Sequence, residues 1–138
     1  MNYKVDEGLF KDDCVAVRQD WGVLQQHLRK KGQNLDLVEM PNQFAAGFGN
    51  LNYYIIFNGR PAVLRRPPMN SFVQGANDML REAKVLNALS PVFPLVPEFL
   101  FVGHDLNVWG VPFLIMEYGP GITVKSTLPG HMRNKHLI

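Results

Sequence analysis

The sequence predicts an α+β fold in which a mostly antiparallel sheet of five strands carries one helix between its third and fourth strands and another helix before its first. Three observations lead to this prediction. Apolar residues recur at helical spacing in two segments, short β-favouring segments alternate with glycine, asparagine and proline turns, and one helical segment interrupts the series of strands. A chain of 138 residues, 46% of them hydrophobic, has enough apolar material for one core, so we expect a single domain.

The first element is an amphipathic helix that starts at Val17. Its apolar residues recur at helical spacing, and a basic turn over residues 29–31 followed by Gly32 is typical of a helix end. These apolar residues are Val17, Trp21, Leu24 and Leu28. We expect residues 34–40 to form a connector and residues 1–16 to be an N-terminal extension.

A strand, a turn of small residues and a β-rich strand come next, at Gln43–Phe44, 45–50 and Leu51–Phe57. The dipeptide Asn58-Gly59 suits the positive φ angles of a type I′ turn. Residues 51–57 and Pro61–Arg66 should therefore pair as a hairpin.

The second helix is predicted over Ala76–Leu89, where apolar residues recur at helical spacing and Pro91 closes the segment. Two further strands follow at Glu98–Val102 and Val111–Tyr118. Residues 103–110 between them have a glycine at each end and the composition of a hairpin loop.

Composition excludes several classes of protein. Fourteen basic and twelve acidic residues give a formal net charge of +2, which offers no broad basic surface for nucleic acid or membrane. The lone Cys14 excludes an internal disulfide and a cysteine-built metal site, which suits a reducing compartment. Apolar runs such as residues 111–116 are far below the ~20 residues of a membrane span, and residues 1–13 show no signal-peptide core. We therefore expect a cytoplasmic protein.

Glu82 is the first residue whose position indicates chemistry. Helical spacing places it on the same face as Val85, Leu86 and Leu89. A buried carboxylate needs a cationic partner. Arg65 on the third strand is the leading candidate, with Arg66 on the opposite face; reversed strand parity would exchange the two. The alternative is a surface pair between Glu82 and a neighbour such as Arg81.

The order of these parts matches the way in which kinase-like folds bind ATP. A glycine-containing turn at Gly47-Phe48-Gly49 precedes a basic strand residue, which a helix glutamate would hold. Main-chain N–H groups of such a turn can approach phosphate oxygens. Two glycines between strands are more often only a hairpin, so the order of the parts carries the prediction.

Four segments resemble the aminoglycoside phosphotransferase family, particularly its branch associated with acyl-CoA dehydrogenases. Phe44–Leu51 is similar to the phosphate loop of that branch, Ala62–Pro68 to its third strand, Asp78–Leu86 to its helix, and Gly110–Tyr118 to its fifth strand and hinge. The resemblance covers residues 17 to 128. It implies the N-terminal lobe of a protein-kinase-like fold, which binds ATP or another nucleoside triphosphate and uses Mg²⁺ in the complete enzyme.

The resemblance also implies a role for each matching residue. Arg65 would hold phosphate, Glu82 would be its helix partner, and Ile115 and Met116 would border the base. The main chain of Glu117 and Tyr118 would hydrogen-bond adenine. The phosphate loop would comprise Gly47, Phe48, Gly49 and Asn50.

The resemblance implies that residues 17–118 form the nucleotide-binding lobe. Residues 119–138 would then form an exit from the hinge and a linker towards a C-terminal lobe. Two departures stand out. The loop reads Ala46-Gly47-Phe48-Gly49-Asn50 where the family usually has glycine-glycine-any-serine-asparagine. The family's histidine-glycine-aspartate catalytic loop and second metal-binding aspartate are not found in these 138 residues, and His104-Asp105 is interpreted as a turn.

These features predict the small lobe of an ATP-dependent small-molecule phosphotransferase. We assign it no catalytic residue and no metal site, and it would meet its hydroxyl acceptor only together with a C-terminal lobe. The alternative is a non-catalytic module that self-associates into a homo-oligomer through residues 111–118 and the tail after Gly119.

Overall fold

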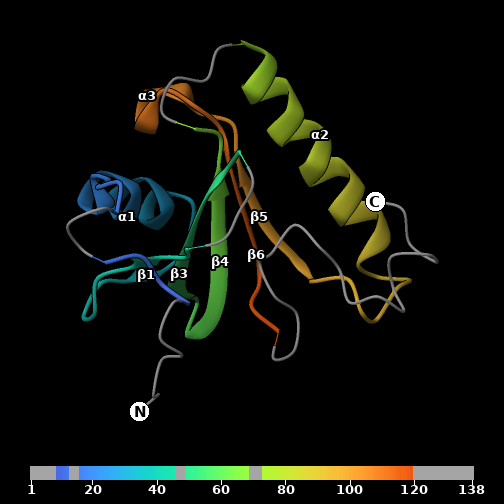
Figure 1. Ribbon diagram of the computed structural model, residues 1–138, viewed down its shortest axis with the longest axis horizontal. Helices are drawn as coiled ribbons and strands as arrows, with labels where there is room; N and C mark the ends of the chain where they lie inside the picture. The colour runs from blue at the N-terminus through green and yellow to red at the C-terminus, as the bar shows by residue number, and fades with distance from the viewer. Residues whose placement is uncertain (1–8, 13–15, 46–48, 69–72, 120–138) are drawn as a thin grey trace.

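The computed structural model describes residues 9–12, 16–45, 49–68 and 73–119. Over these residues it contains a six-stranded sheet flanked by helices on both faces (Figure 1). The elements are α1 (Trp21–Lys30), β1 (Leu35–Asp36), β2 (Asn42–Gln43), β3 (Leu51–Phe57), β4 (Arg60–Arg66), α2 (Val73–Leu89), β5 (Phe99–Gly103), α3 (Leu106–Trp109) and β6 (Phe113–Glu117).

The strands follow the order β1-β3-β4-β6-β5, and β2 pairs with β3 beside β1. Every pairing is antiparallel. The predicted α+β class, the antiparallel sheet and the helix inserted between the third and fourth predicted strands, which is α2 between β4 and β5, are confirmed. The sheet has one strand more than predicted, because β1 lies in the segment interpreted as a connector.

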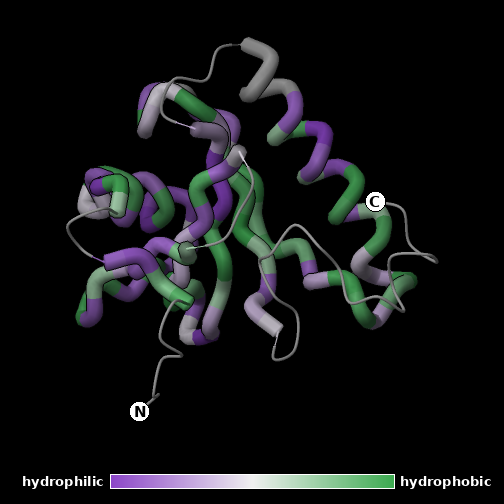
Figure 2. The backbone as a smooth tube through the Cα atoms, viewed as in Figure 1, coloured by the Kyte–Doolittle hydropathy of each residue, from purple (hydrophilic) through white to green (hydrophobic). Residues whose placement is uncertain are grey.

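Two hydrophobic cores lie on opposite faces of the sheet. In β4, Ala62 and Leu64 belong to the core beneath α1, whereas Val63 belongs to the core beneath α2. This is the alternation that a pleated strand imposes. Figure 2 shows that hydrophobic residues are concentrated in the central strands, while both long helices alternate between hydrophobic and hydrophilic positions. We call the face of the sheet beneath α1 the α1 face and the face beneath α2 the α2 face.

The β3–β4 hairpin has the predicted turn. Asn58 and Gly59 both have positive φ angles, 50° and 79°, and Phe57 pairs directly with Arg60. The Asn58 side chain also accepts a hydrogen bond from the Asn34 N–H at 2.7 Å, and its own N–H donates to the Asn34 carbonyl at 2.8 Å. These bonds align the segment after α1 with the hairpin, which explains how two residues there form β1.

Helix α1 starts later than the apolar spacing predicts. The side chain of Asp20 caps the helix by accepting from the Val23 N–H at 3.1 Å. Val17 lies outside the helix because its main chain binds the sheet side chains: its N–H donates to Gln43 Oε1 at 2.7 Å, and its carbonyl accepts from the Tyr53 hydroxyl at 2.7 Å. The predicted start at Val17 was therefore wrong.

The predicted hairpin loop between β5 and β6 contains the short helix α3. Gly103, predicted as a loop residue, is the last residue of β5. The indole N–H of Trp109 in α3 donates to the Asp20 carbonyl at 3.1 Å, so α3 packs beside the start of α1. Among the described helices, none combines the length and the apolar character required to cross a lipid bilayer.

Candidate functional site

Arg65 and Glu82 form an ion pair on the α2 face. Arg65 lies on β4, and its guanidinium Nη1 donates to Glu82 Oε1 on α2. Its Nε donates to Asn52 Oδ1 at 2.7 Å. Asn52, only 2% exposed, stands directly opposite Arg65 in the β3–β4 register. The predicted pair is confirmed, and Asn52 is a second partner that the sequence reasoning missed.

Burial sets the electrostatics of this cation. Removal from water disfavours the charged guanidinium and lowers the pKa of Arg65 below its ordinary value. The side chain keeps 21% of its surface exposed, and that of Glu82 keeps 35%. The structure thus holds a partly dehydrated cation at a fixed position, where a second anion could contact it.

Arg66 lies on the opposite face, as strand alternation predicts. It is 3% exposed and donates to Gln19 Oε1 at 2.8 Å and to the Pro67 carbonyl at 3.1 Å. Its guanidinium carbon lies 5.6 Å from the centre of the Trp109 ring, a cation–π arrangement. The alternative in which Arg65 and Arg66 exchange faces is therefore excluded, and Arg66 packs on the α1 face.

The buried face of α2 is rotated from the predicted one. Met79 and Ala83 are the buried residues, at 1% and 3% exposure, whereas Val85 is 38% exposed. Glu82 therefore lies at the edge of the buried face, close enough to the sheet to meet Arg65. Arg81 pairs with Asp78 at 3.3 Å, so the alternative of a surface pair between Arg81 and Glu82 does not hold.

Strand β6 divides its side chains between the two faces. Met116 belongs to the α2-face core and stands opposite Val63 in the register. Ile115 belongs to the α1-face core. Of the two residues expected to border a base, only Met116 shares a face with Arg65, and the prediction for Ile115 was wrong because it ignored strand alternation.

Glu117 and Tyr118, the expected hinge residues, already use their N–H groups. The Glu117 N–H donates to the Glu98 carbonyl at 2.9 Å, and the Tyr118 N–H makes a long contact of 3.5 Å with the Pro61 carbonyl. The Glu117 carboxylate pairs with Arg60 at 3.1 Å. The Glu117 N–H, expected to bind adenine, is therefore engaged within the chain.

Three aromatic rings lie on the α2 face between β2 and the end of β6. Phe44 and Tyr118 are stacked with centroids 5.8 Å apart, and Tyr54 meets Tyr118 edge to face at 5.3 Å. Phe44 and Tyr54 are 6.4 Å apart. All three belong to the same core as Val63 and Met116. The aromatic character of this site was not recognised in the sequence, although Tyr54 shares strand parity with Asn52.

The predicted phosphate loop is described only in part. Gly47 and Phe48 lie outside the described residues. Gly49 has a φ of 70°, which favours glycine, and Asn50 is half-buried just before β3. Gly49 and Asn50 come directly before β3, the strand that carries Asn52.

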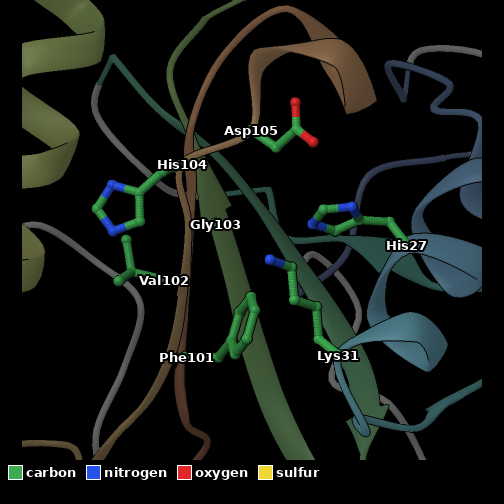
Figure 3. Close-up of a pocket in the computed structure, with 7 residues that line it drawn as sticks. All are labelled: His27, Lys31, Phe101, Val102, Gly103, His104 and Asp105. Atoms are coloured by element: carbon green, nitrogen blue, oxygen red, sulfur yellow. The ribbon is translucent and has the colours of Figure 1, made fainter.

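A pocket of about 400 Å³ lies elsewhere, on the α1 side of β5 (Figure 3). His27 from α1 and Lys31 from the end of that helix extend towards it, and residues 101–105 line it from β5 and the segment that follows. Asp105 accepts from the Asn107 N–H at 2.8 Å, as in an Asx turn. This local bond agrees with the interpretation of His104-Asp105 as a turn.

Two further predictions concern absent groups and surfaces. Within the described part of the chain, no group of three or more His, Cys, Asp or Glu side chains could hold a metal ion. Of residues 111–118, expected to form a self-association surface, residues 111–116 are buried inside the chain and residues 117–118 are half-buried. The tail from residue 120 onward lies outside the described residues.

Comparison with known proteins identifies curated relatives that are much longer than this chain. Acyl-CoA dehydrogenase family member 10 of Mus musculus is 38% identical over 89 residues, which are 64% of this chain and 8% of that protein. Acyl-CoA dehydrogenase family member 11 is 32% identical over 108 residues in both Pongo abelii and Homo sapiens, covering 78% of this chain and 14% of each relative. The chain thus spans only a small part of their length.

A solved structure from Ralstonia eutropha, described as that of a candidate aminoglycoside phosphotransferase, has the same fold. It aligns with a TM-score of 0.57 and 25% sequence identity over 76% of this chain and 29% of that chain. The likeness confirms the fold predicted for a kinase-like N-terminal lobe. Residues 42–136, which include Arg65 and Glu82, match the family model described as the phosphotransferase enzyme family. The chain therefore belongs to the phosphotransferase enzyme family.

Proposed function

We propose that the α2 face around Arg65 binds the phosphates of ATP, or of another nucleoside triphosphate, with Mg²⁺. The chain would then be the nucleotide-binding lobe of an enzyme that transfers a phosphoryl group to a hydroxyl of a small molecule. The observation that carries this proposal is the Arg65 guanidinium, which Asn52 and Glu82 hold from two different elements.

A cation held in this way suits a phosphate. The contacts with Asn52 and Glu82 engage Nε and Nη1 of Arg65, and a guanidinium has five N–H donors in a planar fork. A phosphate oxygen could accept from donors outside those two bonds. Charge-assisted hydrogen bonds of this kind are roughly twice as strong as neutral ones. Glu82 would fix the direction of the cation and so favour productive binding of the nucleotide.

The end of β6 supports a base next to the phosphates. Met116 and Val63 pack in the apolar core on the same face as Arg65, at 4% and 3% exposure. Because the Glu117 N–H donates to the Glu98 carbonyl, a base would bind other main-chain groups there.

Phosphoryl transfer itself needs further groups. A base that accepts the hydroxyl proton and carboxylates that hold Mg²⁺ are required for this reaction, and the 138 residues contain no histidine-glycine-aspartate segment. We infer that these groups, together with the specificity for the acceptor, come from residues outside this segment.

The test is a thermal unfolding experiment with Mg²⁺ and ATP. A ligand at about tenfold its Kd stabilises the folded state by about 1.4 kcal/mol, which raises the Tm of a small domain by several degrees. We expect this shift for the unmodified chain and for Arg81→Ala, an exposed arginine on α2. We expect no shift for Arg65→Ala.

Arg65→Met serves as a second variant because it keeps the apolar part of the side chain if Arg65→Ala does not fold. A folded Arg65→Met protein that binds ATP as tightly as the unmodified chain would exclude Arg65 from phosphate binding. The absence of any shift in the unmodified chain at high ATP would contradict nucleotide binding altogether.

A further inference from the structure

The segment before α1 adds a strand-like edge to the sheet. The Lys11 N–H donates to the Gln43 carbonyl at 2.8 Å, and the Ala45 N–H donates to the Leu9 carbonyl at 2.9 Å. Phe10 stands opposite Phe44 in an antiparallel bridge. Residues 9–11 therefore continue the sheet beyond β2, although the sequence analysis treated residues 1–16 as an extension outside the lobe.

This pairing determines the direction of the Phe10 side chain. Residues directly opposite each other in an antiparallel pair point to the same face, so Phe10 shares the α2 face with Phe44. The two ring centroids are 5.0 Å apart, and the Phe10 ring meets Tyr54 edge to face at 6.1 Å. Phe10 is half-buried and packs against the core that contains Val63 and Met116.

Helix α2 covers only part of this face. It contacts β5 and β6, whereas Phe10, Phe44 and Tyr54 lie at the opposite side of the sheet, near β2 and β3. Arg65 on β4 stands between the two parts. The result is a cation with a row of aromatic rings beside it on one face.

We propose that Phe10 forms an outer wall of the base site, supplied by residues N-terminal to the lobe. This inference rests on the proposed nucleotide binding. A purine is a flat π-system that stacks on aromatic side chains whatever its hydrogen-bonding pattern. Phe10, Tyr54 and Tyr118, each half-buried, provide such rings from three separate parts of the chain. The main-chain hydrogen bonds of Leu9 and Lys11, on either side of Phe10, hold that ring at the edge.

The proposal separates the contacts of the base from those of the phosphates. Phe10 would contact the base and Arg65 the phosphates, so the two residues should respond to different probes. Removal of one aromatic contact with a base weakens binding by roughly 5- to 150-fold. Removal of Phe10 should not change the affinity for a phosphate chain that carries no base.

The experiment is calorimetric titration of the 138-residue chain with ATP and with inorganic tripolyphosphate, both in Mg²⁺. We expect Phe10→Ala to weaken ATP binding about tenfold or more and to leave tripolyphosphate binding unchanged. Arg65→Met should weaken the binding of both. Lys11→Ala is the matched control, because Lys11 is exposed and its pairing with Gln43 uses only the main chain.

Phe10→Leu keeps apolar bulk without the π-system and replaces Phe10→Ala if the latter is unfolded in a thermal melt. Equal or tighter ATP binding by the folded Phe10 variants, with Arg65→Met still defective, would overturn the role of Phe10 and leave the proposed function intact. Loss of tripolyphosphate binding in the Phe10 variants would also overturn it. If the unmodified chain binds neither probe, both proposals fail.

Discussion

Arg65 and Glu82 are 17 residues apart in the sequence, yet the guanidinium of one meets the carboxylate of the other where β4 faces α2. Asn52 completes the arrangement from β3, so three elements converge on one cation. Because each partner comes from a different element, the pair connects the hairpin to the helix.

Removal of the Glu82 carboxylate should destabilise the fold. Glu82→Ala leaves Arg65 partly buried, with Asn52 as the partner that remains. A fully buried pair that loses one partner costs about 3–5 kcal/mol. Since Glu82 keeps 35% of its surface exposed, we expect a loss of about 1–2 kcal/mol after solvent screening. Urea denaturation measures this difference.

Asp78→Ala is the control for that experiment, because its pair with Arg81 is exposed on the same helix. It should change the free energy of unfolding by less than about 0.5 kcal/mol. Equal effects of the two substitutions would mean that the Arg65–Glu82 pair contributes no more than a surface pair.

Gly103 should tolerate no side chain. A Cβ at this position would lie 2.2 Å from the Phe113 ring, and Phe113, which stands opposite Gly103 on β6, is fully buried. We expect Gly103→Ala to cost about 1–3 kcal/mol through overpacking. Thermal melts should show a lower Tm.

Gly22→Ala is the control for Gly103→Ala, because the added Cβ has room at this position and should not destabilise the fold. The nearest atom to its added Cβ is Asp20 Oδ1 at 3.6 Å, and alanine favours a helix over glycine by roughly 1 kcal/mol. The Tm of Gly22→Ala should stay the same or rise. A fall in the Tm of Gly22→Ala as large as that of Gly103→Ala would argue against the role of the Phe113 contact.

Local sequence signals predicted the central part of the fold and of the site. Asn58-Gly59 determined both the turn and the register of the hairpin, and strand alternation then separated Arg65 from Arg66. The same register places Asn52 opposite Arg65, so counting back from the turn would have identified this partner as well.

Elements that depend on tertiary contacts could not be predicted in this way. Strand β1 consists of two residues, too few to show periodicity, and it forms because Asn58 binds the segment before it. Phe10 joins the sheet through a single bridge, which has no sequence signature. Val17 fits the helical spacing, but Gln43 and Tyr53 compete for its main chain.

The turn between β3 and β4 should respond differently to substitutions at its two central residues. Gly59 has a φ of 79°, where an L side chain is strained, so Gly59→Ala should cost about 1–2 kcal/mol. Asn58→Gly keeps the backbone freedom and loses the side-chain bonds to the Asn34 N–H and Gln33 Oε1. Hydrogen exchange should therefore accelerate at Asn34 more than at the β3–β4 amides. Uniform acceleration over all of these amides would contradict a separate role for the Asn58 side chain.

Tyr53 should make stability depend on pH in the alkaline range. Burial raises the pKa of its hydroxyl above the ordinary value, although the bond from Gln19 and the charge of Arg66 act in the opposite direction. The hydroxyl donates to the Val17 carbonyl at 2.7 Å and accepts from Gln19 at 3.0 Å. These bonds connect the segment before α1 to β3.

The sign of the effect follows from proton linkage. Below the unfolded pKa of about 10, both states keep the phenolic proton, and the contribution of Tyr53 is fully present. Above it, the unfolded chain releases the proton while the folded chain retains it, so stability falls as pH rises towards the folded pKa. Tyr53→Phe removes this dependence together with the two hydrogen bonds, which contribute about 0.5–1.5 kcal/mol each.

We therefore expect the stability advantage of the unmodified chain over Tyr53→Phe to shrink between about pH 9 and about pH 11. Urea denaturation of both proteins at several pH values measures this advantage, and the difference between them cancels the contributions of groups that the two proteins share. A constant difference across the range would show that Tyr53 has the same pKa in both states. A growing difference would reverse the sign and mean that the folded chain stabilises the phenolate, with Arg66 rather than burial as the dominant influence.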